Sequence, residues 1–377
     1  MGAAPTCSAC VNDALRWAYL LAETAALVVV VPRLLRASRR GRVLVDDSNR
    51  GIDGQRGEAS TRDISVVIPA RNEANRIKEC ILPLRDAPRV REVIVVDDES
   101  TDATAAVARE LGATVVRGAA LPSGWAGKIW ALQQGIDAAS SEFIVTLDAD
   151  ARPSPALPGA AVEALLQSGA VFATVAPKFR STTAMSQWLH ASMLTSLVYR
   201  HGAGAGRADR DSVANGQCMV FRGQDATNGE WCRSVRGETI EDVALVRRLA
   251  REGRHVEMFD GHRLLTVQMF EGFVDTWRGW GRSLALSSVD RPSRQWLDAI
   301  VTLIALVLPI WLLASGVATP VSGVLLLLRV GTLLGTVRVY ERPGLGYWLS
   351  PLADLLAWFV VVRGIISPSR QWRGREY

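Results

Sequence analysis

The sequence predicts an α/β domain with an open, mostly parallel β-sheet, placed between transmembrane helices at both ends of the chain. Between about Thr61 and Asp275, short apolar strand patterns alternate with helical patterns, and charge and glycine are mixed as in a globular domain. Hydrophobic residues make up 49% of the 377 residues and concentrate at the two ends. This composition is too apolar for a wholly soluble protein.

The charge of the chain favours a membrane surface, and not nucleic acid, as a partner. The formal net charge is +5 and the pI is about 9.2. The arginines cluster beside the apolar segments rather than along one face of the central domain, so anionic lipid headgroups explain their placement better. The five cysteines form no paired framework, and Cys7 and Cys10 have no second pair at zinc spacing. A reducing compartment with structural cysteines is the simplest interpretation.

An apolar stretch near the start of the chain resembles a signal anchor. Residues 17–31 are apolar except for Glu23 and Thr24. Five arginines follow at once, at Arg33, Arg36, Arg39, Arg40 and Arg42. A cleaved signal peptide would carry its positive charge before the apolar run. The positive-inside rule therefore places the following domain in the cytoplasm, with the protein in the cell membrane.

Three further apolar segments lie near the end of the chain. Residues 297–316 and 317–337 are each close to the ~20 residues that cross a bilayer, and together they predict a helical hairpin. Residues 347–366 are long enough to cross, but arginines flank both ends, so this segment either spans against the positive-inside rule or lies in the interface. Charges inside the apolar segments, such as Arg329 and Asp354, favour pairing or snorkelling over a transport path.

These patterns divide the chain into four parts. Residues 1–42 form an N-terminal anchor with its basic flank, and residues 60–272 form the cytoplasmic α/β domain. Residues 273–296 form an amphipathic interfacial segment. Residues 297–377 form a multi-pass membrane region of two to three helices with a basic tail.

Within the central domain, polar residues follow the predicted strands. The expected strands are residues 63–69, 93–96, 114–116 and 143–147, and the expected helices are residues 74–85, 103–111 and 128–138. In open parallel sheets, ligands bind beyond the carboxyl ends of the strands. Acidic residues follow three of the four strands, and their mutual repulsion requires a cation or hydrogen-bond donors in the same site.

Four motifs in this order resemble the GT-A glycosyltransferases of family 2, over roughly residues 64–282. They are VVIPARNE at residues 66–73, VVDDESTD at 95–102, LDAD at 147–150 and the pair Glu241-Asp242. The resemblance implies a GT-A domain, which is a Rossmann-like open sheet. Within that family, PSGWAGKIWA at 122–131 and QWRGREY at 371–377 resemble membrane enzymes associated with carotenoid and hopanoid biosynthesis.

Asp148 and Asp150 are the predicted metal ligands. They are two residues apart after a strand, so both carboxylates can reach one ligand if the chain turns after Leu147. Such hard oxygen ligands suit Mg²⁺ or Mn²⁺ held jointly with a diphosphate. A turn with a helix cap before Pro153 is the alternative. The resemblance implies that Asp150 binds the metal and that Asp148 contacts ribose or metal.

The resemblance also implies a set of residues that bind the nucleotide-sugar donor. One of Asp97 and Asp98 recognises the uracil or ribose, although an Asx turn explains the same pair. Lys128 begins a helix, where a positive charge is disfavoured unless a phosphate binds there; a solvated lysine is the alternative. The full set is Pro69, Ala70, Arg71, Glu73, Asp97, Asp98, Lys128, Asp148 and Arg282. A surface ion pair is the alternative explanation for Arg71 and Glu73. For Arg282 the alternative is a place on an interfacial helix over residues 273–289.

Glu241 and Asp242 are the predicted catalytic pair. They precede a helical pattern at residues 243–251, so the helix dipole alone explains acids at this position. The resemblance places Asp242 at the acceptor, as the general base that removes a hydroxyl proton during inverting displacement. If the acceptor is already a phosphate or carboxylate, Asp242 only positions it.

The predicted activity is transfer of a single hexose from a nucleotide-diphosphate sugar, a UDP-sugar first, to an isoprenoid lipid such as a carotenoid or hopanoid. WRGWGR at residues 277–282 departs from the Gln-x-x-Arg-Trp pattern of processive family members, which argues against polymer synthesis. Two alternatives stay open: a polyprenyl-phosphate glycosyltransferase, and a noncatalytic nucleotide-sugar-binding membrane protein. A transporter is disfavoured because the few apolar helices offer no polar faces.

Overall fold

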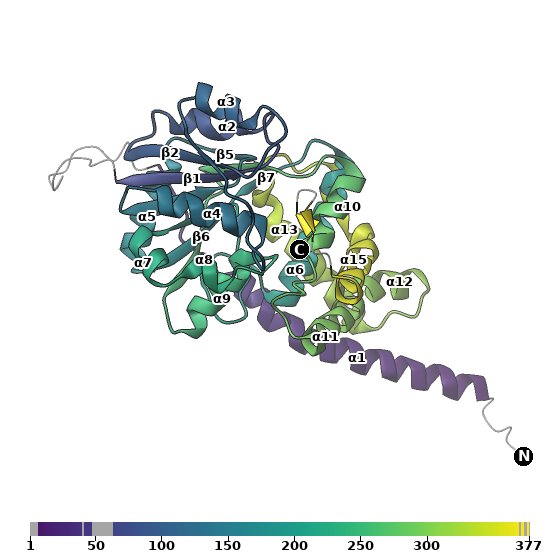
Figure 1. The fold of residues 1–377 in the computed structure, drawn as a ribbon. Coiled ribbons are helices and arrows are strands. Elements are labelled where there is room, and N and C mark those ends of the chain that lie inside the picture. Colours follow the sequence, from purple (N-terminus) through teal and green to yellow (C-terminus); the bar gives the residue numbers. More distant parts are fainter. Residues whose placement is uncertain (1–6, 40, 47–62, 369–370, 373–374, 377) are drawn as a thin grey trace, which may run out of the picture.

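The computed structural model describes residues 7–39, 41–46, 63–368, 371–372 and 375–376, with side chains described from Arg16 onward and up to Pro368. Arg40, residues 60–62 and part of the terminal motif lie outside the described residues. An eight-stranded sheet forms one side of the molecule, and long helices lie beside it (Figure 1). This arrangement confirms the predicted α/β domain with a mostly parallel sheet and apolar helices near both ends.

The elements follow one another in a regular order along the chain. The strands are β1 Ile64–Ala70, β2 Val90–Asp97, β3 Thr114–Arg117, β4 Phe143–Leu147, β5 Ala151–Pro153, β6 Phe172–Ala176, β7 Lys178–Arg180, β8 Gly206–Arg207, β9 Cys218–Arg222, β10 Val256–Asp260, β11 Leu265–Gln268, β12 Gln371–Trp372 and β13 Arg375–Glu376. The helices are α1 Cys7–Ala37, α2 Ile77–Ile81, α3 Thr104–Glu110, α4 Gly127–Ala138, α5 Leu157–Ser168, α6 Ala184–His201, α7 Gly223–Asn228, α8 Trp231–Ser234, α9 Glu241–Arg251, α10 Gly272–Ser283, α11 Pro292–Thr302, α12 Leu308–Ala314, α13 Pro320–Thr336, α14 Leu345–Trp348 and α15 Asp354–Ile366. Short 3-10 turns η2 Leu82–Leu84, η4 Val337–Val339 and η5 Ser350–Ala353 and the π turn η3 Leu303–Val307 join some of them.

The first four strands form the parallel half of the sheet. The sheet order is β3-β2-β1-β4-β9-β6-β10-β8, and β3, β2, β1 and β4 are mutually parallel. All four match strands expected from the sequence. The expected helix at residues 74–85 is shorter, because Pro83 lacks the N–H that a continuing α-helix needs, and η2 replaces its last turn.

Strand β9 reverses direction in the middle of the sheet. It pairs antiparallel with both β4 and β6. The start of β9 therefore lies at the carboxyl end of β4, where the Asp148 N–H donates to the carbonyl of Gln217 at 3.0 Å. This reversal brings the loop at residues 215–217 to the edge where the strands β1, β2 and β4 end.

Helices cover both faces of the sheet because its central strands are apolar on both sides. In β1, Val66 and Ile68 pack in one core with α2 and α5, whereas Val67 packs in a second core with α4 and α9. All seven residues of β1 are buried. A strand of this kind fits only in the middle of a layered α/β fold.

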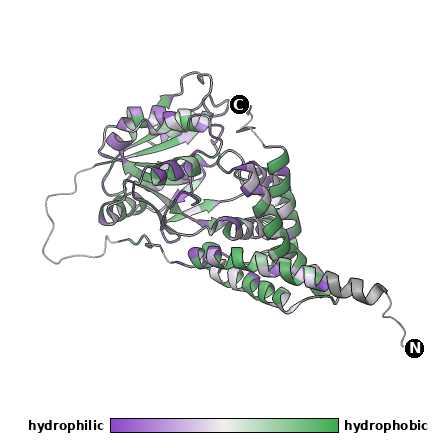
Figure 2. Cartoon of the chain, turned by 90° about the horizontal axis from the view of Figure 1, so that it is seen from below, coloured by the Kyte–Doolittle hydropathy of each residue, from purple (hydrophilic) through white to green (hydrophobic). Residues whose placement is uncertain are grey.

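Three described helices are long and apolar enough to cross a membrane. They cover Arg16–Ala37, Pro292–Ala314 and Pro320–Val339. Figure 2 shows that apolar residues gather on the helices beside the sheet, and α1 extends away from the body in Figure 1. Within these helices Glu23 accepts a hydrogen bond from Ser322 at 2.6 Å, and Arg329 pairs with Asp354 at 2.8 Å. The charges are thus paired, as expected.

The apolar stretch at residues 347–366 is not one continuous helix. It is divided into α14, η5 and α15, with the break at Ser350-Pro351. Pro351 starts the 3-10 turn η5, because proline fixes φ and cannot donate to the preceding turn. Its last part, α15, packs against α6, α10 and α11.

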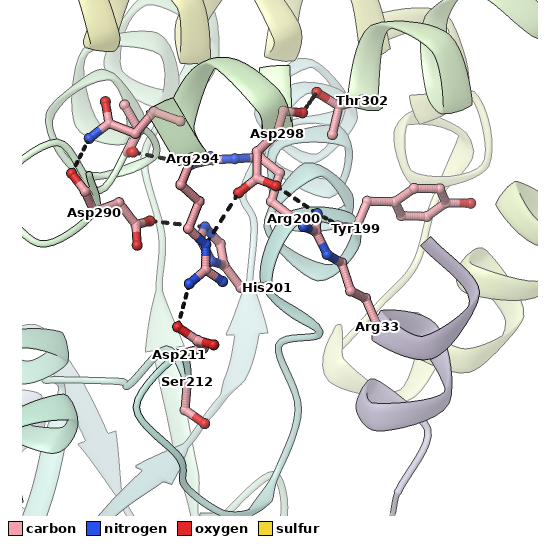
Figure 3. A network of polar contacts seen from close by, with 12 residues as sticks. Arg33, Tyr199, Arg200, His201, Asp211, Ser212, Asp290, Arg294, Asp298 and Thr302 are labelled. Carbon is pink, nitrogen blue, oxygen red and sulfur yellow. Dashed lines mark hydrogen bonds and ion pairs between the residues drawn. The ribbon is translucent and has the colours of Figure 1, made fainter. Parts of the chain in front are cut away.

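A buried cluster of charges joins the sheet domain to the apolar helices (Figure 3). Asp298 of α11 is fully buried and pairs with Arg33 of α1 at 2.8 Å. Asp290 is buried between Arg247 of α9, at 2.7 Å, and His201 of α6, at 3.7 Å. The cluster therefore ties four helices together at the boundary between the two parts of the molecule.

The buried carboxylate of Asp298 makes a strong contribution to this junction. We expect Asp298→Ala to lower the free energy of unfolding by about 3–5 kcal/mol, because it removes a carboxylate partner of the largely buried Arg33 and of the fully buried Arg200. Glu252→Ala removes an exposed pair with Arg248 and is the matched control, with a loss below about 1 kcal/mol. Thermal unfolding of the full chain in detergent measures both. Equal shifts for the two variants would contradict this role.

Candidate functional site

Lys128 connects two carboxylates that come from distant parts of the chain. Its Nζ lies 2.9 Å from Asp148 Oδ1, after β4, and 3.0 Å from Glu241 Oε1, at the start of α9. The same ammonium group lies 3.5 Å from the carbonyl oxygen of Gly216. The structure thus brings together Lys128, Asp148, Glu241 and, beside Glu241, Asp242.

The acidic neighbours explain how a lysine is accommodated at the start of a helix. Lys128 is the second residue of α4, where the helix dipole disfavours a positive charge. Burial alone would lower the pKa of Lys128, but the carboxylates of Asp148, Glu241 and Asp242 raise it above its ordinary value. Lys128 is therefore charged throughout the physiological pH range.

Asp242 is a carboxylate with a raised proton affinity. Burial and then the neighbouring Glu241 raise its pKa to about 6, although Lys128 and the backbone N–H groups of Val243 and Gly216 oppose this rise. A Cβ atom on Gly216 would lie 3.1 Å from the Asp242 carboxyl carbon and from Oδ2. Glycine at position 216 therefore lets the backbone approach the carboxylate closely enough to donate to it.

Two neighbouring cavities meet at this cluster. The first, which we call the Asp242 cavity, has a volume of about 360 Å³; the second, the Asp150 cavity, has about 690 Å³. Asp148, Gln217 and Arg282 line both. The Asp242 cavity has mainly apolar walls, from residues that include Leu194, Leu197, Trp280 and Leu286. The Asp150 cavity has polar walls with the four arginines Arg76, Arg278, Arg282 and Arg363.

The residues present fit a divalent metal that is shared with a bound diphosphate. Asp148 and Asp150 both line the Asp150 cavity. Among the described residues, no three His, Cys, Asp or Glu side chains form a group that could hold a metal ion. Mg²⁺ commonly uses one or two carboxylates and completes its shell with water and substrate phosphates. Burial, then Asp150 and Asp148, raise the pKa of the nearby Cys80 thiol. Without a metal Cys80 is therefore a thiol, and the carboxylate oxygens of Asp148 and Asp150 are the hard donors that suit Mg²⁺ or Mn²⁺.

The residues predicted at the ends of β1 and β2 form a separate group at the sheet edge. Arg71 Nη1 donates to the Asp98 carbonyl at 2.6 Å, and Asp97 accepts from the Ser100 N–H at 3.3 Å. Arg76 approaches Glu73 at 3.9 Å. Pro69 and Ala70 are buried within β1, paired with Val96 and Asp97. None of the residues predicted there, Pro69, Ala70, Arg71, Glu73, Asp97 and Asp98, lines the Asp242 or the Asp150 cavity.

Several lining residues were not singled out from the sequence. Arg363 looks in the sequence like the basic flank of a membrane segment, and only the packing of α15 against α10 brings it to the Asp150 cavity. Arg76 resembles an ordinary surface residue of a helix. The dipeptide Asn215-Gly216 is a turn signal, so it predicts a loop before Gln217. It does not predict that this loop lies at the site.

The raised pKa of Asp242 makes a prediction about stability. Its folded pKa lies above its unfolded value, so the folded state binds more protons between about pH 4 and 6 and loses stability as the pH rises through that window. We expect Asp242→Asn to stabilise the protein by between about 2 and 3 kcal/mol at neutral pH, and by less near pH 4. Thermal unfolding across this pH range measures the difference.

The neighbouring substitution Glu241→Gln is the control, and its effect has the opposite sign. It weakens a partner of the buried Lys128 charge and destabilises the fold. An Asp242→Asn variant that is less stable than the parent at neutral pH would contradict the raised pKa of Asp242 in the folded protein.

The chain is similar to known proteins over the region that contains this site. Residues 65–225 match the family model described as Glycosyl transferase family 2. Two curated relatives are both named 4,4'-diaponeurosporenoate glycosyltransferase. The one from Staphylococcus haemolyticus (strain JCSC1435) is 28% identical over 250 residues, covering 63% of this chain and 64% of the relative. The one from Staphylococcus aureus (strain MRSA252) is 30% identical over 233 residues, covering 59% and 60%.

The matched region thus spans less than two thirds of the length of these relatives. Among solved structures, the mannosyltransferase PcManGT from Pyrobaculum calidifontis, in complex with GDP-Man and Mn²⁺, superposes with a TM-score of 0.53 at 17% identity. The match covers 94% of this chain and 99% of that one, which shows a shared GT-A fold. The chain therefore has a GT-A fold and is similar to glycosyltransferase family 2 over residues 65–225, and to the two diaponeurosporenoate glycosyltransferases over 63% and 59% of its length.

Proposed function

We propose that the protein transfers a single hexose from a nucleotide-diphosphate sugar to an isoprenoid lipid at the membrane surface, in an inverting displacement. The observation that carries this proposal is the meeting of an arginine-rich cavity and an apolar cavity at one cluster of acidic side chains. A charged donor and an apolar acceptor would each find a matching cavity. Their reacting groups would meet beside Asp148 and Asp242.

The Asp150 cavity is the proposed donor site. Its arginines, Arg76, Arg278, Arg282 and Arg363, would neutralise the diphosphate, because guanidinium groups pair well with phosphate oxygens. Lys128 lies close enough to Asp148 to exchange a carboxylate partner for a phosphate. A UDP-sugar is the first candidate donor. Asp97 or Asp98, which do not line the Asp150 cavity, would recognise its uracil or ribose where the nucleotide extends beyond that cavity to the end of β2. GDP-Man in the solved mannosyltransferase makes GDP-sugars the second.

Asp148 and Asp150 are the residues that would hold a divalent metal, Mg²⁺ or Mn²⁺. Bound there, the metal would stabilise the negative charge that develops on the leaving diphosphate. The solved mannosyltransferase contains Mn²⁺. When no donor is bound, Asp148 pairs with Lys128, which also contacts the Gly216 carbonyl.

Asp242 is the proposed general base. The acceptor oxygen would attack the anomeric carbon from the face opposite the leaving diphosphate, so a new carbon–oxygen bond forms while the bond to phosphate oxygen breaks. Asp242 would take the hydroxyl proton, and its pKa of about 6 suits a base that works near neutral pH. The name of the curated relatives specifies a carboxylate acceptor. For such an acceptor Asp242 and Glu241 would act in positioning.

Sugar transfer by the purified full chain tests the proposal. We expect the parent protein, with a UDP-sugar or GDP-sugar and Mn²⁺ or Mg²⁺, to convert isoprenoid alcohols or acids to glycosylated products detected by mass spectrometry. Asp150→Ala removes a proposed ligand of the metal that would stabilise the charge on the leaving diphosphate. We expect kcat to fall by at least about 100-fold. EDTA has the same effect on the parent protein.

The matched control for the acidic variants is Asp137→Asn, on the exposed side of α4. It leaves both cavities intact and keeps full activity. Binding of donor with no turnover on any isoprenoid would instead favour the noncatalytic nucleotide-sugar-binding protein. Products formed only from polyprenyl phosphates would favour the polyprenyl-phosphate glycosyltransferase.

The pH dependence distinguishes the two roles of Asp242. With an alcohol acceptor, kcat/KM falls about tenfold per pH unit below pH 6, because the base is protonated there. Asp242→Asn loses most activity with the alcohol at every pH. With a carboxylic acid acceptor, the same variant keeps substantial activity. An alcohol profile that stays flat down to pH 4.5 would exclude Asp242 as the base.

A further inference from the structure

A third cavity adjoins the Asp242 cavity on the side of the membrane helices. It has a volume of about 210 Å³. The two cavities share six lining residues, which are Phe179, Leu194, Leu197, Val213, Ala214 and Asn215. The two cavities therefore adjoin along these largely apolar side chains, and we call the third one the α1/α13 cavity.

The α1/α13 cavity lies where two candidate membrane spans end. Ala37 and Arg39 border it at the end of α1, and residues 335–339 border it at the end of α13. Arg39 and Arg338 are exposed at this level. Exposed arginines that follow apolar helices mark the depth of the lipid headgroups. The cavity therefore opens at the height at which a bilayer meets the sheet domain.

The walls of the α1/α13 cavity suit a hydrocarbon chain. Leu194, Leu197 and Val198 of α6 form one side. The polar residues Asp260 and His262 also line the cavity, but they hydrogen-bond to each other at 2.7 Å, which reduces their need for a polar ligand. By contrast, the Asp150 cavity reaches the helices through Arg363 and Arg278, and an apolar chain there would have to displace solvated charges.

We propose that the α1/α13 cavity binds the isoprenoid chain of the acceptor, which enters from the bilayer between the ends of α1 and α13 with its polar end toward Asp242. The proposal rests on the proposed function and adds the route and the binding site of the lipid. The polar end of the chain reaches the Asp242 cavity, and the remainder trails through the α1/α13 cavity into the bilayer. Donor and acceptor thus approach from different sides and meet at Asp148.

Gly335 offers a way to close this route without disturbing the fold. It lies on α13, is exposed and borders the cavity, and a Cβ atom added there meets nothing within 4 Å. Gly331 lies one turn earlier on the same helix, is equally exposed and free of contacts, and does not line the cavity. Gly335→Phe and Gly331→Phe are therefore a matched pair that differ only in whether the new ring reaches the cavity.

Photolabelling tests the binding site without requiring turnover. The full chain, in lipid nanodiscs, is irradiated with a diazirine analogue of geranylgeraniol, and labelled peptides are identified by mass spectrometry. We expect labels on α6 near Leu197 and on residues 335–339, with competition by unlabelled geranylgeraniol. Each buried methylene contributes about fourfold to affinity, and the ring of Gly335→Phe excludes several methylenes from the cavity. We therefore expect Gly335→Phe to reduce labelling by at least about tenfold and Gly331→Phe to leave it unchanged.

A second readout separates this proposal from the proposed function. If the enzyme is active, Gly335→Phe raises KM for geranylgeraniol by at least about tenfold but changes KM for the shorter geraniol by less than about threefold. Binding of UDP with Mn²⁺ stays as in the parent protein, which confirms an intact fold. Labels on α10 and α15 instead, or equal losses in the two glycine variants, would overturn the proposed route. Competed labelling without any sugar transfer would retain the lipid site and reject the proposed function.

Discussion

Two buried carboxylates, Asp290 and Asp298, fix how the sheet domain sits against the apolar helices. A carboxylate removed from water is stable only where cations meet it with good geometry. These cations are Arg33 of α1, Arg247 of α9 and Arg294 of α11, and these helices belong to both parts of the molecule. Because the ions tolerate little displacement, the junction holds the sheet domain in one orientation. The cavities at the junction depend on that orientation, since residues from both sides line them.

Buried carboxylates also determine the arrangement of the candidate site, but there one of them is destabilised in its ionised form. Lys128 holds Asp148 and Glu241 together, but Asp242 has no such direct ion pair with any described residue, and its pKa is raised. Its ionised form is thus unfavourable in the folded protein. A stability cost of this kind is typical of groups that are used in binding or catalysis. Gly216 contributes to the same arrangement by bringing its N–H to the carboxylate.

The sequence predicts the parallel half of the sheet well, because each of its strands is a short apolar run followed by polar residues. The position of Asp148 and Asp150 follows from the same rule, and both line one cavity. The reversed strand β9 was beyond prediction, since its direction is set by pairing with β4 and β6 and not by its own residues. Arg363 was missed for the same reason, because its role depends on packing between α10 and α15. Pro351 was the available signal for the break at residues 347–366, and apolar content alone concealed it.

The direction of β9 has an evolutionary consequence. Because β9 runs against its neighbours, the chain reaches Asp148 through a connection that precedes a strand, at residues 208–217. Residues of that connection also bind elsewhere, because Arg294 pairs with Asp211 and Gly216 approaches Asp242. Evolution can therefore change substrate preference here by single substitutions, whereas a change in length would disturb the junction and the site together.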